Sequence, residues 1–482
     1  MSMVDPVFNA ALERVLDRVV PDFVALENVV RLSGGASQET HAVDIQTHDG
    51  SRRLALRRAP GGMYGFNDHG RPGLAVEARL MQLAAAAGVP EPTVLHVLTR
   101  DDALGDGFLM DWLEGETLGQ RIVRDEAFAA IRPQLASQCG GILARIHAID
   151  IEAHGLDQVL ETLPPEAFVR RQWEHYQSLN TPQPMIDYTA RWLLDNLPRP
   201  SRLTLVHNDF RNGNLMITPT TGVTAVLDWE VAHIGDPMRD LGWICTNSWR
   251  FGNSAMTVGG FGALDDLIRG YEAVSGTPVD RGTVHFWQVF GSYWWAIGCL
   301  TMAEHYRSGP DRSVERPAIG RRSSECQVDC VNLLIPGPVN PPTESAPLLP
   351  QSDLPYTEEI VGSVRDFLRG DVAGTASGRH RFLARVAANA LDIALREMAS
   401  GPAQASAERS RLETLLGSCG TVDELRRQLS ARLQAGEFAL DDDGLTSHLR
   451  ETVVARCAID QPGYSGLQTA LERGMTRERA PS

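Results

Sequence analysis

The chain has 482 residues and a formal net charge of −16, with 61 acidic side chains against 45 basic ones. This balance disfavours nucleic acid and anionic membranes as partners, because binding to either relies on basic side chains that neutralise phosphates. Its composition, 43% hydrophobic and 22% charged residues, is that of a globular protein, and its length predicts two or three compact units. Seven scattered cysteines and the lack of an apolar signal region favour reduced thiols and a cytoplasmic location.

The first part of the chain reads as a small β-rich unit. A glycine-containing turn from Leu32 to Thr40 lies between two strand-like segments, and residues 53–57 alternate like a strand. Apolar residues at helical spacing predict a helix from about Ala75 to Ala87. A further strand, followed by a hinge segment, is expected within residues 107–115.

The most informative stretch runs from Leu205 to Glu230. An apolar strand ends at Val206, a loop carries Asp209 and Asn214, and two short strands joined by a hairpin turn lead to Asp228. Phosphoryl transfer needs a base that accepts the proton of the attacking hydroxyl, and oxygen ligands that hold Mg²⁺ on the phosphates. Asp209 would be the base, with Asn214 and Asp228 as the ligands, because Mg²⁺ prefers oxygen. Phosphoryl transfer is therefore the leading hypothesis.

Two later segments bear on the organisation of the chain. Phe286 to Ala303 is eighteen residues without a charge, which is long enough for a membrane span. Its internal polar residues and the lack of a flanking basic cluster favour a buried helix instead. Residues 335–356 contain seven prolines and cannot form a helix or a central strand. Beyond them, apolar residues at helical spacing, with a leucine stripe from Leu412 to Leu433, predict a helical unit.

The chain resembles the aminoglycoside phosphotransferase and choline kinase-like family. The family signatures Val-His-x-Asp-x-x-x-x-Asn and Asp-Trp-Glu stand here as His207 to Asn214 and Asp228 to Glu230. The match continues through Gly235-Asp-Pro-Met-Arg-Asp-Leu241 and covers about residues 25 to 335. Asp236 and Asp240 are expected to brace the following helix and not to contact ligand.

This resemblance implies a two-lobed, protein-kinase-like α+β fold with an added all-α domain. A small β-rich nucleotide-binding lobe is expected in residues 1–110, and a larger, mainly helical catalytic and substrate lobe in residues 111–334. A proline-rich linker, residues 335–356, would lead to a helical domain of unknown role, residues 357–482. That last part resembles a helical domain of unassigned function found beside such kinases in bacteria.

The resemblance also assigns a nucleotide site. The residues that would bind ATP are Gly34, Gly35, Ser37, Arg57, Glu77, Asp111 and Trp112. The glycine turn would bring backbone N–H groups to the phosphates, and backbone groups of the last two residues would hold adenine. Arg57 stands where the family usually has a phosphate-pairing lysine, with Glu77 as its ion-pair partner. Arginine is not a conservative replacement for lysine, so either Arg57 does that work or the site is altered.

The acceptor is left open by the sequence. Segments at Arg57–Pro60, Phe168–Trp173 and Ala318–Arg322 look like the branch of the family associated with acyl-CoA dehydrogenases and with phosphorylation of hydroxyacyl-CoA. These segments hold the arginines Arg170, Arg171, Arg321 and Arg322. They would suit an anionic acid or coenzyme A, although surface ion pairs would explain each of them equally well.

We therefore expect an ATP- and Mg²⁺-dependent kinase of a small-molecule hydroxyl, with a hydroxyacyl-CoA or a hydroxy acid as the candidate acceptor. Two alternatives stay open. One is an aminoglycoside-type kinase, and the other is a degenerate kinase that binds nucleotide or acyl-CoA as a scaffold. The sequence does not give the oligomeric state.

Overall fold

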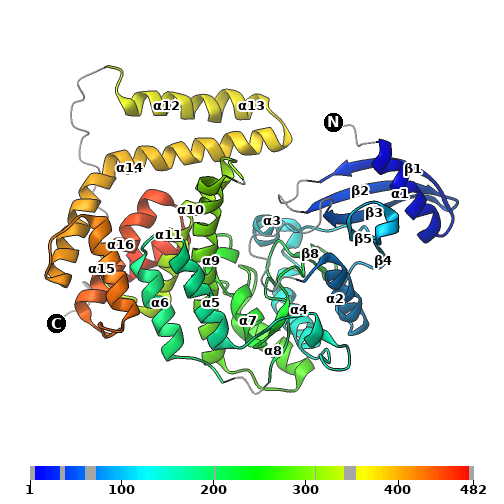
Figure 1. Cartoon of the computed structure of the whole chain (residues 1–482), viewed down its shortest axis with the longest axis horizontal. Coiled ribbons are helices and arrows are strands. Elements are labelled where there is room, and N and C mark those ends of the chain that lie inside the picture. Colours follow the sequence, from blue (N-terminus) through cyan, green and yellow to red (C-terminus); the bar gives the residue numbers. More distant parts are fainter. Residues whose placement is uncertain are drawn as a thin grey trace. The chain divides into compact units, whose positions relative to one another are not determined.

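The computed structural model describes residues 6–32, 38–59, 72–199, 202–309, 311–340 and 354–476. The fold is α+β, with a β-rich first part and helices through most of the rest (Figure 1). Contacts between Cα atoms divide the chain into two compact units. Unit 1 consists of Met1–Pro165 and Arg199–Gln288, and unit 2 consists of Glu166–Pro198 and Val289–Ser482.

Unit 1 begins with a five-stranded antiparallel sheet of order β1-β2-β3-β5-β4 (Figure 1). Its strands are β1 (Phe23–Arg31), β2 (Glu39–Thr47), β3 (Gly50–Ala59), β4 (Val94–Val97) and β5 (Asp106–Asp111). Helices α1 (Pro6–Val19) and α2 (Leu74–Ala86) pack on opposite faces of this sheet. Because side chains alternate along a strand, Leu54 and Leu56 of β3 face α1, and Arg57 points to the face that α2 covers. The strand and the helix predicted here from the sequence are present as β3 and α2.

The rest of unit 1 combines short strands with helices around one hydrophobic core. Its strands are β6 (Thr162–Leu163), β7 (Thr204–Val206), β8 (Leu215–Thr218), β9 (Gly222–Val226) and β10 (His233–Gly235). Its helices are α3 (Gly119–Arg124), α4 (Arg132–His147), α7 (Met238–Ile244) and α8 (Leu264–Ser275). Strand β10 lies between β6 and β7, and β8 pairs with β9 as the predicted hairpin. Single-turn helices lie at Arg100–Asp102, Glu126–Phe128, Leu156–Gln158 and Asn247–Trp249.

The regular elements among the described residues of unit 2 are all helices. Its first helices are α5 (Pro165–Ser178) and α6 (Pro184–Asp195), followed later in the chain by the part of α9 (Arg281–Ser308) from Val289 on, α10 (Glu315–Arg321) and α11 (Ser323–Leu334). The C-terminal helices are α12 (Thr357–Phe367), α13 (Ala373–Thr375), α14 (Gly378–Leu416), α15 (Val422–Gln434), α16 (Asp443–Asp460) and α17 (Ser465–Thr476), with a π-helical turn at Leu368–Val372. Helix α12 runs along the first part of α14 (Figure 1).

The C-terminal helices share a hydrophobic core with helices from earlier in the chain. This core includes Met185, Tyr188, Val328, Val331, Leu412, Leu425, Leu429, Leu433 and Leu449. Hydrogen bonds join the same helices, since Gln434 Nε2 donates to Asp187 Oδ1 and Tyr188 Oη donates to the Leu440 carbonyl, both at 2.9 Å. The proline-rich segment therefore does not mark the boundary of a compact unit, because helices on both sides of it bury one core. This division differs from the separate helical domain expected from the sequence.

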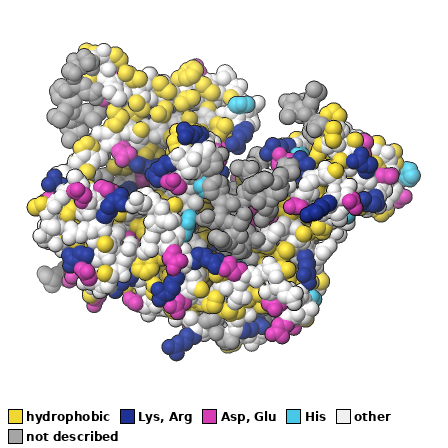
Figure 2. All heavy atoms as spheres, in the orientation of Figure 1, with side chains coloured by type: hydrophobic (Ala, Val, Ile, Leu, Met, Phe, Trp, Pro, Cys, Tyr) yellow, Lys and Arg dark blue, Asp and Glu magenta, His cyan; other side chains and the backbone are white. Residues whose placement is uncertain are grey.

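The charge-free segment from Phe286 to Ala303 lies inside α9. Trp287 and Tyr293 are fully buried there, as expected for a helix that packs in a protein interior. Within the described ranges, no helix is long and apolar enough to cross a membrane. Hydrophobic side chains are exposed instead on α12 and at the start of α14 (Figure 2), namely Ile360, Val364, Phe367 and Phe382.

Candidate active site

The loop after β7 is fixed by a buried carboxylate. Asp240 of α7 accepts the backbone N–H of His207 at 2.9 Å and that of Asn208 at 2.7 Å, and His147 Nε2 lies 3.1 Å from its Oδ2. Burial alone would raise the pKa of Asp240, but the hydrogen bond from His147 and the amide of His207 hold it below its usual value. Asp240 therefore braces the loop, which is a wider role than bracing its own helix.

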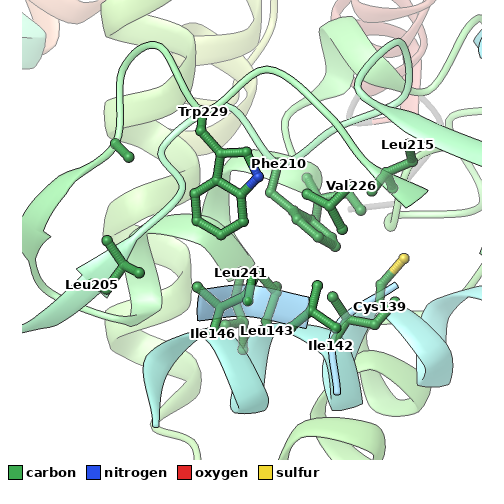
Figure 3. Close-up of a cluster of buried hydrophobic side chains, with 14 of the residues drawn as sticks. Cys139, Ile142, Leu143, Ile146, Leu205, Phe210, Leu215, Val226, Trp229 and Leu241 are labelled. Carbon is green, nitrogen blue, oxygen red and sulfur yellow. The ribbon is translucent and has the colours of Figure 1, made fainter. Parts of the chain in front are cut away.

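Backbone conformation and packing place the two loop carboxylates. Asn208, before Asp209, has φ +68°, and Asp228 has φ +70°, a left-handed conformation that Asn and Asp tolerate better than other residues. The residues that follow the two carboxylates, Phe210 and Trp229, are fully buried and point into the core shown in Figure 3. Each carboxylate is thus held next to an aromatic anchor.

The Asp209 carboxylate is held by three side-chain donors. Trp243 Nε1 and Arg211 Nε donate to its Oδ1 at 2.8 and 2.9 Å, and Asn214 Nδ2 donates to its Oδ2 at 2.6 Å. These bonds fix one orientation, as a base that must meet one hydroxyl requires. Arg211 and Trp243 were missed by the sequence reading. The position of Arg211 within the loop motif could have indicated its role. Trp243 is brought to the loop only by the packing of α7.

The two candidate metal ligands are linked through the backbone. The N–H of Leu227 donates to the carbonyl of Asn214 at 2.8 Å, which joins the end of the hairpin to the loop. Asn214 is buried, with 6% of its surface exposed, and its side-chain nitrogen also donates to the Asp209 carbonyl at 3.0 Å. Asp209, Asn214 and Asp228 are therefore gathered in one region of unit 1.

This donor set fits a magnesium ion. The described contacts leave Oδ1 of Asn214 and Oδ2 of Asp228 without a hydrogen bond, so an amide and a carboxylate oxygen remain for a cation. Mg²⁺ keeps several waters and is usually held by one or two carboxylates together with substrate phosphates. Across the described ranges, no group of three or more His, Cys, Asp or Glu could hold a metal.

Arg57 lies between two carboxylates. Its Nη2 donates to Asp228 Oδ1 at 2.7 Å, and its Nε lies 3.3 Å from Glu77 Oε1. The pair with Glu77 was expected from the sequence, but the contact with Asp228 was not. The chain contains no lysine, so all 45 of its basic side chains are arginines. Arginine at position 57 therefore follows the usage of the whole chain and is no sign of a degenerate site.

Burial and neighbouring charges shift the pKa values of the groups in this ion-pair cluster. Burial, together with the nearby Asp228 and Glu230, raises the pKa of Glu77 to about 7 although Arg57 opposes the change. Burial would lower the pKa of Arg57, but Glu77 and Asp228 outweigh it and raise that pKa above its usual value. Oε2 of Glu77 is buried and has no hydrogen-bond partner among the described residues.

The other residues predicted to bind nucleotide differ in whether the structure describes them and in what they contact. Gly34, Gly35 and Ser37 lie outside the described residues. The N–H of Asp111 donates to the Thr93 carbonyl at 2.9 Å, so this group is already engaged within the sheet. Trp112 Nε1 donates to Glu114 at 2.8 Å. The backbone of Trp112 is therefore the part that could contact adenine.

The arginines considered for an anionic substrate belong to unit 2. Arg170 pairs with Glu166 one helical turn away at 2.8 Å, and Arg322 pairs with Glu325 at 3.0 Å. Arg321 pairs with Asp460 at 2.7 Å, a contact to a C-terminal helix. Local ion pairs thus account for two of them, and Arg321 lines a cavity described below.

Family models match two parts of the chain. The model of the phosphotransferase enzyme family matches residues 28–276, and the model of a domain of unknown function, DUF6285, matches residues 374–464. Among solved structures, one from Ralstonia eutropha, provisionally assigned as an aminoglycoside phosphotransferase, aligns with a TM-score of 0.54 and 23% identity. The alignment covers 67% of this chain and 97% of that one, and it shows a shared fold.

Two curated relatives match in sequence. Acyl-CoA dehydrogenase family member 10 of Mus musculus is 31% identical over 227 residues, which are 45% of this chain and 20% of that protein. Acyl-CoA dehydrogenase family member 11 of Gallus gallus is 30% identical over 250 residues, which are 49% of this chain and 30% of that protein. The chain thus spans less than a third of either relative.

Proposed function

Because this chain belongs to the phosphotransferase enzyme family, we propose that it transfers the γ-phosphoryl group of ATP, with Mg²⁺, to a hydroxyl of a small molecule. The observation that carries the proposal is the Asp209 carboxylate, fixed by three donors beside the free oxygens of Asn214 and Asp228. A scaffold that only binds nucleotide has no need of a base held this firmly.

Asp209 acts through its Oδ2 atom. Its Oδ1 already accepts two hydrogen bonds, whereas Oδ2 accepts one and keeps capacity for the acceptor hydroxyl. The hydroxyl oxygen attacks the γ-phosphorus, and its proton moves to Oδ2. The bond from phosphorus to the β,γ-bridging oxygen breaks, and its electron pair leaves with ADP.

Asn214 and Asp228 would hold the magnesium ion, which neutralises charge on the phosphate oxygens when it is bound. Arg57 would turn from Asp228 to the phosphates, because it then exchanges one anionic partner for another and frees a carboxylate oxygen. Glu77 would keep the Nε side of the guanidinium in place during this exchange.

The acceptor proposed first is a hydroxyacyl-CoA or a free hydroxy acid. Support comes from the curated relatives, both of which are named as acyl-CoA dehydrogenase family members. An aminoglycoside-type acceptor is the second candidate among enzymes. The contact of Arg57 with Asp228 favours the third candidate, a nucleotide-binding scaffold, because it occupies a metal ligand.

The test is a phosphorylation assay on the full chain with Mg²⁺ and ATP. Hydroxyacyl-CoAs, hydroxy acids, aminoglycosides and amino alcohols are offered, and the phosphorylated product is identified by mass spectrometry. Acceptor-dependent transfer that Asp209→Asn removes supports the kinase, and the acceptor class with the highest kcat/KM identifies the substrate. Tight binding of nucleotide without transfer to any class would favour the scaffold and reject the proposal.

A further inference from the structure

Unit 2 contains a cavity of about 610 Å³ to which no role has been assigned. It is bounded by α9, α10 and α11 on one side and by the C-terminal helices α14, α15 and α16 on the other. Helix α14 contributes Glu397, Gly401, Gln404, Glu408 and Arg411, which recur every three or four residues. That spacing places all five on one face of the helix. The cavity is large enough for a small-molecule ligand.

Its walls carry more positive than negative charge. The charged residues that line it are Arg307, Arg321, Arg411, Arg426, Arg456, Glu397, Glu408 and Asp460. Arg426 binds both oxygens of Glu408. Arg321 binds Asp460 at 2.7 Å through Nε and Glu397 at 2.6 Å through Nη2. Two arginines therefore engage all three carboxylates.

Arg411 and Arg456 are left with neutral partners. Arg411 Nη2 donates to Thr452 Oγ1 at 3.2 Å, and Arg456 Nη1 donates to the Gln183 side chain. Across the described ranges, neither has a carboxylate oxygen within 4 Å, and the Nε of Arg411 is buried without a hydrogen-bond partner. A partly buried guanidinium without an anion is unfavourable, so a ligand that supplies one would satisfy this site.

The protonation equilibria agree with a shortage of negative charge. Burial, with the neighbouring Arg426 and Arg321, lowers the pKa of Arg456 to about 10, although Glu408 and Asp460 oppose the change. Burial also lowers the pKa of Arg411, although Glu451 and Glu408 oppose the change. Both shifts would reverse on binding of an anion.

We propose that this cavity binds a small molecule that carries a phosphate group, with Arg411 and Arg456 as the residues that hold the phosphate. Two guanidinium groups match the charge of a phosphate dianion, and their planar forks fit its oxygens in pairs. Leu300, Tyr306 and Val422 line the same space and give the organic part of the ligand apolar contacts. This inference stands on unit 2 alone and does not depend on the proposed kinase function.

The test measures binding of inorganic phosphate to the full chain by calorimetry, with succinate as a dicarboxylate of the same charge. We expect phosphate to bind more tightly than succinate, and Arg411→Gln with Arg456→Gln to weaken phosphate binding at least tenfold. The matched control is Arg427→Gln, which removes an exposed arginine of α15 that pairs with Asp423. This control should leave the affinity within twofold of wild type.

Hydrogen exchange on the wild-type chain gives a second readout that needs no variant. Phosphate should slow exchange of backbone amides in α14 and α16. Unchanged binding in the double variant, preference for succinate, or no added protection in α14 and α16 would each overturn the proposal.

Discussion

The partly buried arginines of the two units differ in their partners. In unit 1, Arg57 has carboxylates on both sides, Asp228 at 2.7 Å and Glu77 at 3.3 Å. In unit 2, Arg411 and Arg456 donate to a hydroxyl and an amide, and the nearby carboxylates belong to other arginines. A guanidinium that is already neutralised must exchange a partner when an anion arrives. A guanidinium without a carboxylate partner binds the anion without giving up an existing ion pair.

The difference suggests two kinds of binding. The exchange proposed for Arg57 would link nucleotide binding to the release of Asp228, a proposed metal ligand, so phosphate and metal should bind together. Nothing of this kind is required in unit 2, where anion binding should be independent of divalent metal.

Removing the C-terminal helices should have the largest effect on the stability of the protein. A chain that ends at Leu334 loses α12 to α17 and uncovers Met185, Tyr188 and Val328. Each such side chain contributes about 1.5–3 kcal/mol when buried, so their loss together rivals a total stability of about 5–15 kcal/mol. We expect aggregation, measured by light scattering and by the loss of a cooperative thermal transition. A soluble, cooperatively melting product would instead support the separate helical domain that the sequence suggested.

Replacement of the proposed base should act on unit 1 alone. Asp209→Asn should lower kcat about 10²- to 10⁴-fold, or about 3–5 kcal/mol of barrier, because the hydroxyl proton loses its acceptor. Nucleotide affinity, measured by calorimetry, should stay within a factor of about two, since a base acts on the acceptor and not on ATP. Phosphate binding in unit 2 should not change. A variant that keeps half of the wild-type rate would show that Asp209 is not the base.

The carboxylates around Arg57 should cost stability at high pH. The pKa of Glu77 is raised from 4.5 to about 7, so the folded chain holds a proton that the unfolded chain releases in this range. The associated stability is full below pH 4.5 and is lost as pH rises through 7. The side chain of Glu77→Gln stays neutral. Between pH 5 and 8, the free energy of unfolding of this variant should therefore rise relative to that of wild type, by at most about 3 kcal/mol.

Glu116→Gln is a control of opposite sign for this measurement. Burial alone would raise the pKa of Glu116, but hydrogen bonds from Leu118 and Arg121 lower it. Its stabilising effect is therefore present above its usual pKa and is lost as pH falls. Chemical denaturation at several pH values compares the two variants. Parallel pH profiles for Glu77→Gln and wild type would contradict the assigned charge state.

Restoring the usual lysine of the family should have the smallest effect. Arg57→Lys keeps the charge between Glu77 and Asp228, so we expect kcat/KM for ATP to change by less than about tenfold, or about 1.4 kcal/mol. Arg57→Ala should reduce it more. The control is Arg58→Ala, because Arg58 faces Glu39 at 3.1 Å and donates to the Leu104 carbonyl. Its side chain is 15% exposed. Equal losses in the variants of Arg57 and Arg58 would remove Arg57 from the phosphate site.

The sequence by itself determined the local elements and the order of the site motifs. Alternation along β3, helical periodicity in α2 and turn residues between β8 and β9 act over a few residues, so their patterns can be read directly. The fixed spacing of Asp209 and Asn214 within one loop, with Asp228 one hairpin later, gave the candidate centre for the same reason.

Only the tertiary structure decided what those elements meet. Arg57 and Asp228 lie 171 residues apart, and Trp243 reaches Asp209 through the packing of α7. The leucine stripe of α15 showed that one face is buried, but periodicity does not say against which helix. That face packs on α6 and α14, and the same docking of helices encloses the arginines of the unit 2 cavity. Partners of this kind are chosen by long-range packing, and packing leaves no local signal in the chain.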